Sequence, residues 1–156
     1  MERTRYEVAG WGVGELWTRD DDVLAHEFEF RSGGGPTPEP SGRTSELVRR
    51  VRAFLAGEDV TLGDVPLDLE WCTDFQRTVL GMLRALPRGE VVGYGELAAL
   101  AGRPGAGRAV GTICAENRFA FFVPCHRVVA ASGIGGYGSA GVAVKRRLLA
   151  LEGVVL

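Results

Sequence analysis

The chain has 156 residues, of which 46% are hydrophobic and 24% are charged, the balance of a globular protein that buries a core. No apolar run is long enough to span a bilayer and the first residues lack a signal-peptide core, so we expect a cytoplasmic protein with no membrane partner. The three cysteines, Cys72, Cys114 and Cys125, form no CxxC pair, which argues against a disulfide framework or a zinc site.

The net charge of −2 is distributed unevenly along the chain. Residues 1–70 contain eight Arg and fifteen Asp or Glu (−7), whereas residues 101–156 contain seven Lys or Arg and two Glu (+5). A basic C-terminal segment favours a polyanionic partner such as DNA, although a solvated basic face would give the same counts. Of the eighteen basic residues only Lys145 is a lysine, which we attribute to the base composition of the genome.

The first part of the chain predicts a small sheet followed by one helix. Partial alternation of apolar and polar residues over 4–31 indicates strands, and His26, which has acidic neighbours, is expected on the surface of the last strand. Residues 32–42 are rich in Gly and Pro and predict a flexible loop. A helix is predicted over 45–56, with Ser45 as its N-cap and an apolar stripe on one face.

The second part of the chain predicts helices separated by turns that contain Gly and Pro. A helix capped by Thr73 should run to Leu86, and two shorter helices over 94–101 and 106–116 form a helix-turn-helix pattern. The apolar run 119–123 predicts a strand. The second short helix is rich in small residues, which let a helix backbone approach a narrow groove, so we expect minor-groove docking without sequence readout. These small residues include Ala106, Ala109 and Gly111.

Residues 123–128 carry the strongest chemical signal in the chain. Cys125 stands directly before His126, one of two histidines, and Pro124 fixes the backbone in front of them. A thiol reacts as the thiolate, and an adjacent base lowers its pKa from the usual value of about 8.5. The pair therefore places a nucleophile near a base, although a buried cysteine beside a chance histidine would look the same.

This stretch and its flanks resemble the O6-alkylguanine-DNA alkyltransferases, also called methylated-DNA–protein-cysteine methyltransferases. The resemblance is strong over residues 66–156 and loose over residues 1–65. It implies an α/β (α+β) fold in two domains: a small antiparallel sheet-plus-helix scaffold like ribonuclease H over 1–65, and a helical domain with a winged-helix-like helix-turn-helix and the active-site cysteine over 66–156. The matching text is Thr73-Asp74-Phe75-Gln76, Pro87-Arg88-Gly89-Glu90-Val91, Tyr94-Gly95-Glu96-Leu97-Ala98, Arg108-Ala109-Val110-Gly111, Asn117, Pro124-Cys125-His126-Arg127-Val128-Val129, Lys145 and Glu152-Gly153.

The resemblance also implies a reaction. The alkyl group of O6-alkylguanine, or to a lesser extent of O4-alkylthymine, in duplex DNA is transferred irreversibly to Cys125 in a single turnover, with no cofactor and no metal. A monomer is our default expectation, on which the sequence gives no information. The damaged base is flipped out of the stack to reach the thiol. In the family, His126 takes the thiol proton through a water, Glu152 orients the histidine, and Asn117 buttresses the active-site turn.

Further residues are assigned to DNA and to the guanine pocket by the same resemblance. Arg108 would enter the gap left by the flipped base, although an arginine on this helix could instead bind phosphate, and Tyr94 would bond the flipped guanine. Tyr137 lies in a loop that covers the pocket, but it comes one residue early in the family register, so both Gly138 and Ser139 are candidates for contacting the guanine oxygen. The remaining expected contacts are Arg103, Ala106, Ala109 and Gly111 with DNA, and Val128 with the guanine.

Two alternative functions stay open at this point. A relative that binds alkylated DNA but transfers poorly would fit the shifted Tyr137 loop, although such relatives lack the cysteine. A thiol hydrolase could use the same cysteine, histidine and glutamate, but the helix-turn-helix would then have no role. The other two cysteines, Cys72 and Cys114, are expected to be structural.

Overall fold

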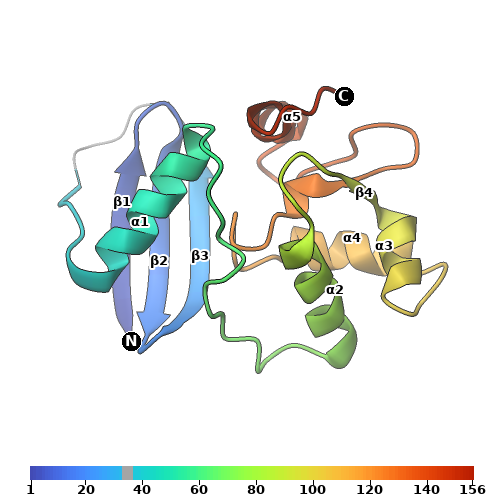
Figure 1. Cartoon of the computed structure of the whole chain (residues 1–156), viewed down its shortest axis with the longest axis horizontal. Coiled ribbons are helices and arrows are strands. Elements are labelled where there is room, and N and C mark those ends of the chain that lie inside the picture. Colours follow the sequence, from blue (N-terminus) through green and yellow to red (C-terminus); the bar gives the residue numbers. More distant parts are fainter. Residues whose placement is uncertain (33–36) are drawn as a thin grey trace. The chain divides into compact units, whose positions relative to one another are not determined.

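The computed structural model of the protein describes residues 1–32 and 37–156, which form a mixed α/β fold with a small antiparallel sheet, as the sequence predicts (Figure 1). Two compact units are present: Met1–Asp68 with Arg118–Phe122, and Leu69–Asn117 with Val123–Leu156. We refer to them as the sheet unit and the helical unit. The domain boundary predicted after residue 65 lies just before the division in the structure, and the sequence did not indicate that residues 118–122 belong with the sheet. Within the predicted loop 32–42, residues 33–36 lie outside the described residues.

The sheet unit is built on three antiparallel strands in the order β1 (Glu2–Val8), β2 (Gly12–Arg19) and β3 (Asp22–Phe30). Tyr6 in β1 pairs with Gly14 in β2, and because side chains alternate along a strand, Tyr6 and Leu16 lie on the same face of the sheet. Both side chains are buried. The face they share is therefore the inner face.

Helix α1 (Gly42–Leu55) lies across the sheet and buries the apolar stripe that the sequence predicts (Figure 1). The predicted N-cap at Ser45 is wrong, because the helix begins one turn earlier, after Ser41. The hydroxyl of Thr44 donates a 2.9 Å hydrogen bond to the Ser41 carbonyl and so completes that first turn. The buried stripe consists of Leu47, Val48, Val51, Phe54 and Leu55.

Two further predictions for this part of the chain are wrong. His26 is only 1% exposed, because the pairing of β2 with β3 shifts register beside Thr18, and the extra residue in β3 brings Val23 and His26 to the same inner face. Residues 119–123 form a turn rather than a strand. Phe121 has a φ of 69°, which reverses the chain after a single isolated bridge between Phe119 and His26.

The helical unit begins with α2 (Asp74–Ala85), whose predicted start is confirmed. The backbone N–H of Gln76 donates to the Thr73 hydroxyl at 3.1 Å, while the Gln76 side-chain carbonyl accepts from the Thr73 backbone N–H at 2.7 Å. This reciprocal pair satisfies two backbone groups that a helix start leaves open. No helix in the described parts of the chain is long and apolar enough to cross a membrane.

The two short helices α3 (Tyr94–Leu100) and α4 (Gly107–Ala115) pack closely on one another, as the sequence predicts. A Cβ atom at Gly107 would lie 3.2 Å from the backbone nitrogen of Gly95, so a larger residue there would push the two helices apart by a few tenths of an ångström. Strand β4 (Val92–Gly93) leads into α3 and pairs in parallel with β5 (Val128–Val129). Since β5 directly follows Cys125–Arg127, this pairing brings the start of α3 to the cysteine turn.

Candidate active site around Cys125

Cys125 begins a short 3₁₀ helix, Cys125–Arg127, that is fixed at both ends. Its backbone N–H donates to the Val123 carbonyl at 2.9 Å, and the Arg127 backbone N–H donates to the Pro124 carbonyl at 3.0 Å. Helix α5 (Val142–Leu151) packs against this turn. The side chains that the turn carries are almost fully buried, with Cys125 5% and His126 0% exposed.

Asn117, at the end of α4, ties that helix to the cysteine turn. Its side-chain amide donates to the Val123 carbonyl at 3.1 Å, and its side chain also hydrogen bonds to the Cys125 thiol. The Val123 carbonyl therefore accepts from both Asn117 and Cys125. The structure thus brings Asn117 and Cys125 together.

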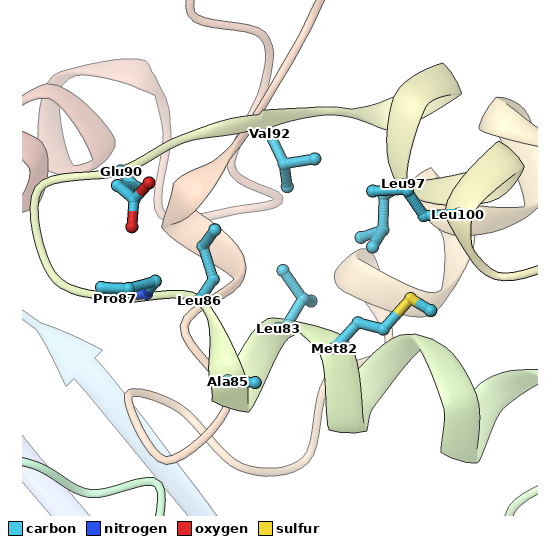
Figure 2. Close-up of a pocket in the computed structure, with 9 residues that line it drawn as sticks. All are labelled: Met82, Leu83, Ala85, Leu86, Pro87, Glu90, Val92, Leu97 and Leu100. Carbon is cyan, nitrogen blue, oxygen red and sulfur yellow. The ribbon is translucent and has the colours of Figure 1, made fainter.

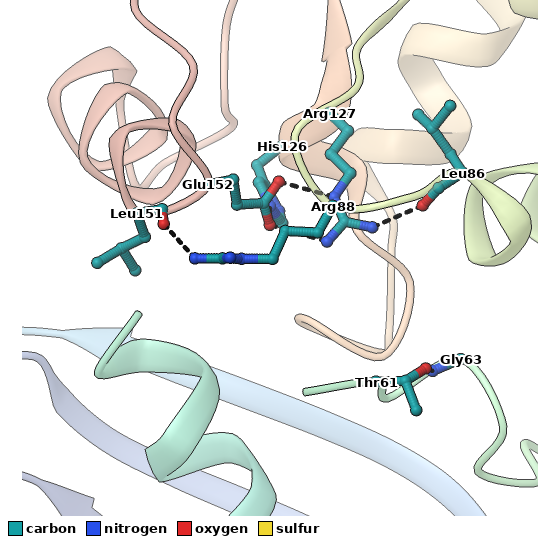
Figure 3. Close-up of polar contacts among 8 residues, drawn as sticks. All are labelled: Thr61, Gly63, Leu86, Arg88, His126, Arg127, Leu151 and Glu152. Carbon is teal, nitrogen blue, oxygen red and sulfur yellow. Dashed lines mark hydrogen bonds and ion pairs between the residues drawn. The ribbon is translucent and has the colours of Figure 1, made fainter. Parts of the chain in front are cut away.

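A buried ionic group lies on the other side of the turn, where Glu152 receives hydrogen bonds from His126 and Arg127 (Figure 3). The His126 Nε2 is 2.9 Å from Glu152 Oε2, and the Arg127 guanidinium donates to both carboxylate oxygens at 2.8 Å. Burial alone would raise the Glu152 pKa, but the bonds from His126 and Arg127 outweigh it and lower the pKa to about 2. Glu152 is therefore an ionised acceptor.

The state of His126 follows from this geometry. A carboxylate can only accept, so Nε2 of His126 carries the proton that points to Glu152, and Nδ1 is the basic atom of the ring. Burial lowers the His126 pKa more strongly than Glu152 raises it. The ring is therefore neutral at pH 7 and able to accept a proton.

Arg127 is a site residue that the sequence analysis missed. Besides its two bonds to Glu152, the guanidinium donates to the Leu86 carbonyl at 2.8 Å and is 8% exposed (Figure 3). The nearby Arg88 donates to the carbonyl of Leu151, directly before Glu152. The only available signal for Arg127 was its place directly after Cys-His, and nothing in a single sequence indicates that its partner lies at residue 152.

Cys114, which is expected to be structural, has its thiol hydrogen bonded to that of Cys125. This bond and then burial raise the pKa of the Cys125 thiol, while Lys145 and Asn117 act in the opposite direction. The Cys125 thiol is therefore protonated at neutral pH and needs a base before it can react. The only clue in the sequence to this contact was that Cys114 lies on the predicted helix that leads to Asn117.

Lys145, the one lysine of the sequence, is fully buried rather than a solvated charge. Its Nζ donates to the Val128 carbonyl at 2.6 Å and to the Gly136 carbonyl at 3.0 Å, and it lies 5.7 Å from the centre of the Tyr94 ring. The Tyr94 hydroxyl also donates to Gly136, at 3.5 Å. Lys145 thus joins β5, α3 and the loop that contains Tyr137. In that loop Tyr137 is half-buried, whereas Gly138 and Ser139 are exposed.

The outer face of α4 is a shallow, open hollow of about 530 Å³ lined mainly by small residues. Of the lining residues, Arg108 is exposed and Gly111 is half-buried. Ala109 of the same helix is exposed, and Ala106, its N-cap, is half-buried. Tyr94 lines the hollow as well, so it borders both this face and the loop contacted by Lys145. Arg103, at the preceding turn, is exposed and lies 4.5 Å from the ring of Phe75. Of the sequence-predicted DNA residues, Arg108, Gly111 and Tyr94 thus line one exposed hollow, whereas Arg103, Ala106 and Ala109 are not among its lining residues.

A separate apolar hollow of about 330 Å³ lies between α2 and α3 (Figure 2). Leu83 and Leu97 line it, and Glu90 is its one charged lining residue. Of its lining residues Leu86 also contacts the group around Cys125, because its carbonyl accepts from Arg127. Within residues 1–32 and 37–156 no cluster of His, Cys, Asp or Glu side chains is arranged to hold a metal ion.

The fold and this site define a class: small α/β proteins whose buried thiol follows two short, closely packed helices and precedes a neutral histidine held by a glutamate. Residues 74–154 match the family described as 6-O-methylguanine DNA methyltransferase, DNA binding domain. The chain belongs to the methylated-DNA–protein-cysteine methyltransferase family.

Individual relatives support this membership. The methylated-DNA–protein-cysteine methyltransferase of Methanothermobacter thermautotrophicus is 38% identical over 144 residues, which cover 92% of this chain and 81% of that protein. The protein of the same name from Mycobacterium tuberculosis is 50% identical over 117 residues, covering 74% and 68%. The crystal structure of Mycobacterium tuberculosis OGT in complex with DNA superposes with a TM-score of 0.81 at 38% identity, covering 98% of this chain and 93% of that chain.

Proposed function

We propose that the protein repairs O6-alkylguanine, and to a lesser extent O4-alkylthymine, in duplex DNA by transferring the alkyl group to Cys125 in a single turnover. One observation carries the proposal: the buried Cys125 thiol shares its turn with a neutral His126 that Glu152 holds, in a chain of the methyltransferase family. The names of the relatives and the DNA complex of OGT support the choice of substrate.

The first step is binding of duplex DNA through α3 and α4, which act as a helix-turn-helix. The small side chains of Ala109 and Gly111 let the backbone of α4 approach the minor groove. Arg108 stands exposed on this face, and its planar guanidinium can stack in the gap left by a flipped base. Tyr94 borders both this face and the loop that contains Gly136 and Tyr137, which suits it to contact the extruded guanine.

The second step is activation of the thiol. The Cys125 proton passes, directly or through a water, to Nδ1 of His126, and the imidazolium that forms is stabilised by the ionised Glu152. Arg127 keeps the carboxylate in place through its two hydrogen bonds. Asn117, which bonds to the sulfur and to the Val123 carbonyl, fixes the direction of attack.

The third step is displacement at the alkyl carbon. A bond forms between that carbon and the Cys125 sulfur while the carbon–O6 bond breaks, and the guanine leaves as an anion that takes up a proton. The guanine lies against Val128 and the loop of Tyr137, with the backbone N–H of Gly138 or Ser139 donating to its oxygen. A thioether has no good leaving group, so the reaction ends there.

The two domains divide the work in this proposal. The sheet unit acts as a ribonuclease H-like scaffold, and the helical unit acts as the alkyltransferase domain with its winged-helix-like helix-turn-helix. The protein acts as a cytoplasmic monomer without a cofactor. The acidic N-terminal segment, with a charge of −7, is repelled by the phosphates of DNA and takes no part in binding it.

Intact mass measurement followed by peptide mapping tests the proposal. The protein is incubated with an excess of duplex DNA that carries one O6-methylguanine, with undamaged duplex and the Cys125→Ser variant as controls. We expect one methyl group per protein, located on Cys125, and no further gain at longer times. Binding without a gain in mass would instead identify a lesion-binding protein. Repeated turnover of an ester or peptide would identify a thiol hydrolase.

A further inference from the structure

His26 is a buried ionisable side chain that the proposed reaction does not use. Its Nδ1 is 2.7 Å from the carbonyl oxygen of Ala120, and its Nε2 is 2.5 Å from the hydroxyl of Tyr6. A carbonyl can only accept, so Nδ1 carries the hydrogen and Nε2 accepts from Tyr6. Burial lowers the His26 pKa to about 4, which is consistent with a neutral ring of this one tautomer.

The sheet is shaped to accommodate this pair. Tyr6 pairs with Gly14, and a Cβ atom at Gly14 would lie 2.4 Å from the Tyr6 ring. Any larger residue at position 14 would displace the ring whose hydroxyl reaches His26. Tyr6 and His26 are 0% and 1% exposed, so their hydrogen bonds are shielded from water.

His26 holds the segment Arg118–Phe122 of the sheet unit by three hydrogen bonds. Two come from its backbone: its N–H donates to the Arg118 carbonyl at 2.7 Å, and its carbonyl accepts from the Ala120 N–H at 3.1 Å. The third is the side-chain bond to the Ala120 carbonyl. The next residue, Phe121, turns the chain at a φ of 69°, and its ring packs 5.4 Å from that of Phe54. Hydrogen bonds and ring packing therefore hold the segment in place just before the chain returns to the helical unit.

The same segment connects two residues of the active-site turn. It leaves the helical unit after Asn117 and re-enters it at Val123, and these two residues are hydrogen bonded to each other at 3.1 Å. The Val123 carbonyl also accepts from the Cys125 N–H at 2.9 Å. A change in the path of residues 118–122 would therefore alter the two hydrogen bonds to the Val123 carbonyl, from Asn117 and from the Cys125 N–H, that orient Cys125.

We propose that His26 is a positioning residue for the reaction at Cys125. Its Nδ1–H bond to the Ala120 carbonyl sets the path of residues 118–122, and through them the Val123 carbonyl to which Asn117 and Cys125 bond. The inference rests on the proposed function in that alkyl transfer is the reaction to be measured. A misplacement of about 1 Å far from the reacting atoms can slow a reaction by about a hundredfold.

Two substitutions of His26 separate positioning from stability. In His26→Asn the amide nitrogen takes the place of Nδ1 and can still donate to Ala120, but the bond from Tyr6 is lost. In His26→Gln the amide reaches the place of Nε2 and can still accept from Tyr6, but the bond to Ala120 is lost. Both variants remove the ring, and Tyr6→Phe serves as a third variant that weakens the cluster while keeping Nδ1 on Ala120.

The rate of methyl transfer is measured under single-turnover conditions at saturating duplex, together with the DNA Kd and the fraction folded. We expect His26→Gln to transfer about tenfold more slowly or worse, with an unchanged Kd, while His26→Asn and Tyr6→Phe stay near the wild-type rate. Equal rates in His26→Gln and wild type, or rates that follow the stability of the three variants, would overturn the proposal.

A second readout does not depend on DNA. The rate at which iodoacetamide alkylates Cys125 is followed against pH by peptide mapping. We expect the pH profile to move in His26→Gln and to match wild type in His26→Asn, whereas identical profiles in all variants would refute positioning. If the wild-type protein took no methyl group from DNA, the proposed function would fail, and this comparison would still decide the role of His26.

Discussion

Replacing Glu152 by Gln tests the arrangement of the active site most directly. The carboxylate accepts from His126 Nε2 and from two nitrogens of Arg127, all at 2.8 to 2.9 Å. An amide keeps the shape of this acceptor but loses its charge. With its one oxygen at the Oε1 position, where it accepts from Arg127 Nε, its NH₂ group stands at the Oε2 position and faces His126 Nε2. Two donors cannot face each other, so the histidine must place its proton on Nδ1.

The consequence for the reaction follows from the tautomer. With the proton on Nδ1, the ring nitrogen proposed as the base can no longer accept, and the imidazolium loses its counter-ion. In a Ser-His-Asp triad, the same carboxylate-to-amide change costs about 10⁴-fold in rate, so we expect methyl transfer by Glu152→Gln to be about 10³- to 10⁴-fold slower.

The consequence for stability can be worked from the pKa of Glu152. A shift from 4.5 to about 2 corresponds to about 3 kcal/mol of stabilisation at pH 7. A folded-state pKa that is lowered means that this contribution is present above pH 4.5 and is lost as the pH falls towards 2. Glu152→Gln should therefore lose about 3 kcal/mol at pH 7 and much less at pH 3.

Single-turnover transfer at saturating duplex and urea denaturation at several pH values measure these two effects. Glu58→Gln, an exposed glutamate of the sheet unit, is the matched control and should behave as wild type in both assays. Transfer by Glu152→Gln at the wild-type rate would refute the assignment of His126 as the base. A stability loss that does not change with pH would refute the ionised state of Glu152.

Four further predictions test individual residues. Cys125→Ser should abolish transfer and retain DNA binding, measured by mass and by gel shift; transfer by this variant would sink the assignment of the nucleophile. Arg108→Ala should slow repair in duplex DNA with much less effect on free O6-benzylguanine, and equal losses on both substrates would contradict a role in base flipping. Cys114→Ala removes the hydrogen bond that raises the Cys125 pKa, so the midpoint of iodoacetamide reactivity should move to lower pH; a move to higher pH would show that Cys114 acts in the opposite sense. Because the His26 pKa is lowered from 6.5 to about 4, the neutral ring stabilises the fold fully above pH 6.5. As the pH falls to 4, the free energy of unfolding, measured by denaturant titration, should decrease by about 3 kcal/mol. A His26→Asn variant should lack this dependence.

Local chemistry made much of the helical unit predictable. Thr73 and Gln76 stand three residues apart before an apolar stripe, and that spacing alone describes the capping box that begins α2. The turn between α3 and α4 carries Gly and Pro, which end helices whatever surrounds them. The start of α1 was misplaced because two serines, Ser41 and Ser45, are both chemically acceptable caps, and only the bond from Thr44 to the Ser41 carbonyl decides between them.

The sheet unit contains features that a local sequence pattern could not predict. His26 was expected on the surface because Glu27 follows it, yet Glu27 is exposed and His26 is buried. The cause is a bulge, which changes the inward side chains of β3 without any mark in its own sequence. Residues 119–123 are apolar enough for a strand, but Phe121 takes a left-handed conformation that is held by aromatic rings from β3 and α1.

The candidate site could be predicted in part, less fully than the helical unit but better than the sheet unit. Cys125 and His126 are adjacent in the chain, so a nucleophile and a base could be proposed from chemistry alone. Glu152 could be named only through the family resemblance, since no periodicity brings residues 126 and 152 together. Arg127 and Lys145 went unrecognised because a basic side chain is normally solvated, and their burial depends on acceptors that come from distant segments.

The protonation states around Cys125 suit the reaction proposed above, in which each protein reacts once. A thiol with a raised pKa rests in the protonated form, which is a poor nucleophile and resists oxidation. A neutral His126 beside it can take the proton, and the ionised Glu152 then balances the imidazolium. An enzyme that turns over many times gains from a thiolate that is always ready. A protein that loses its cysteine at the first reaction gains more from a thiol that stays unreactive until a damaged base fills the pocket.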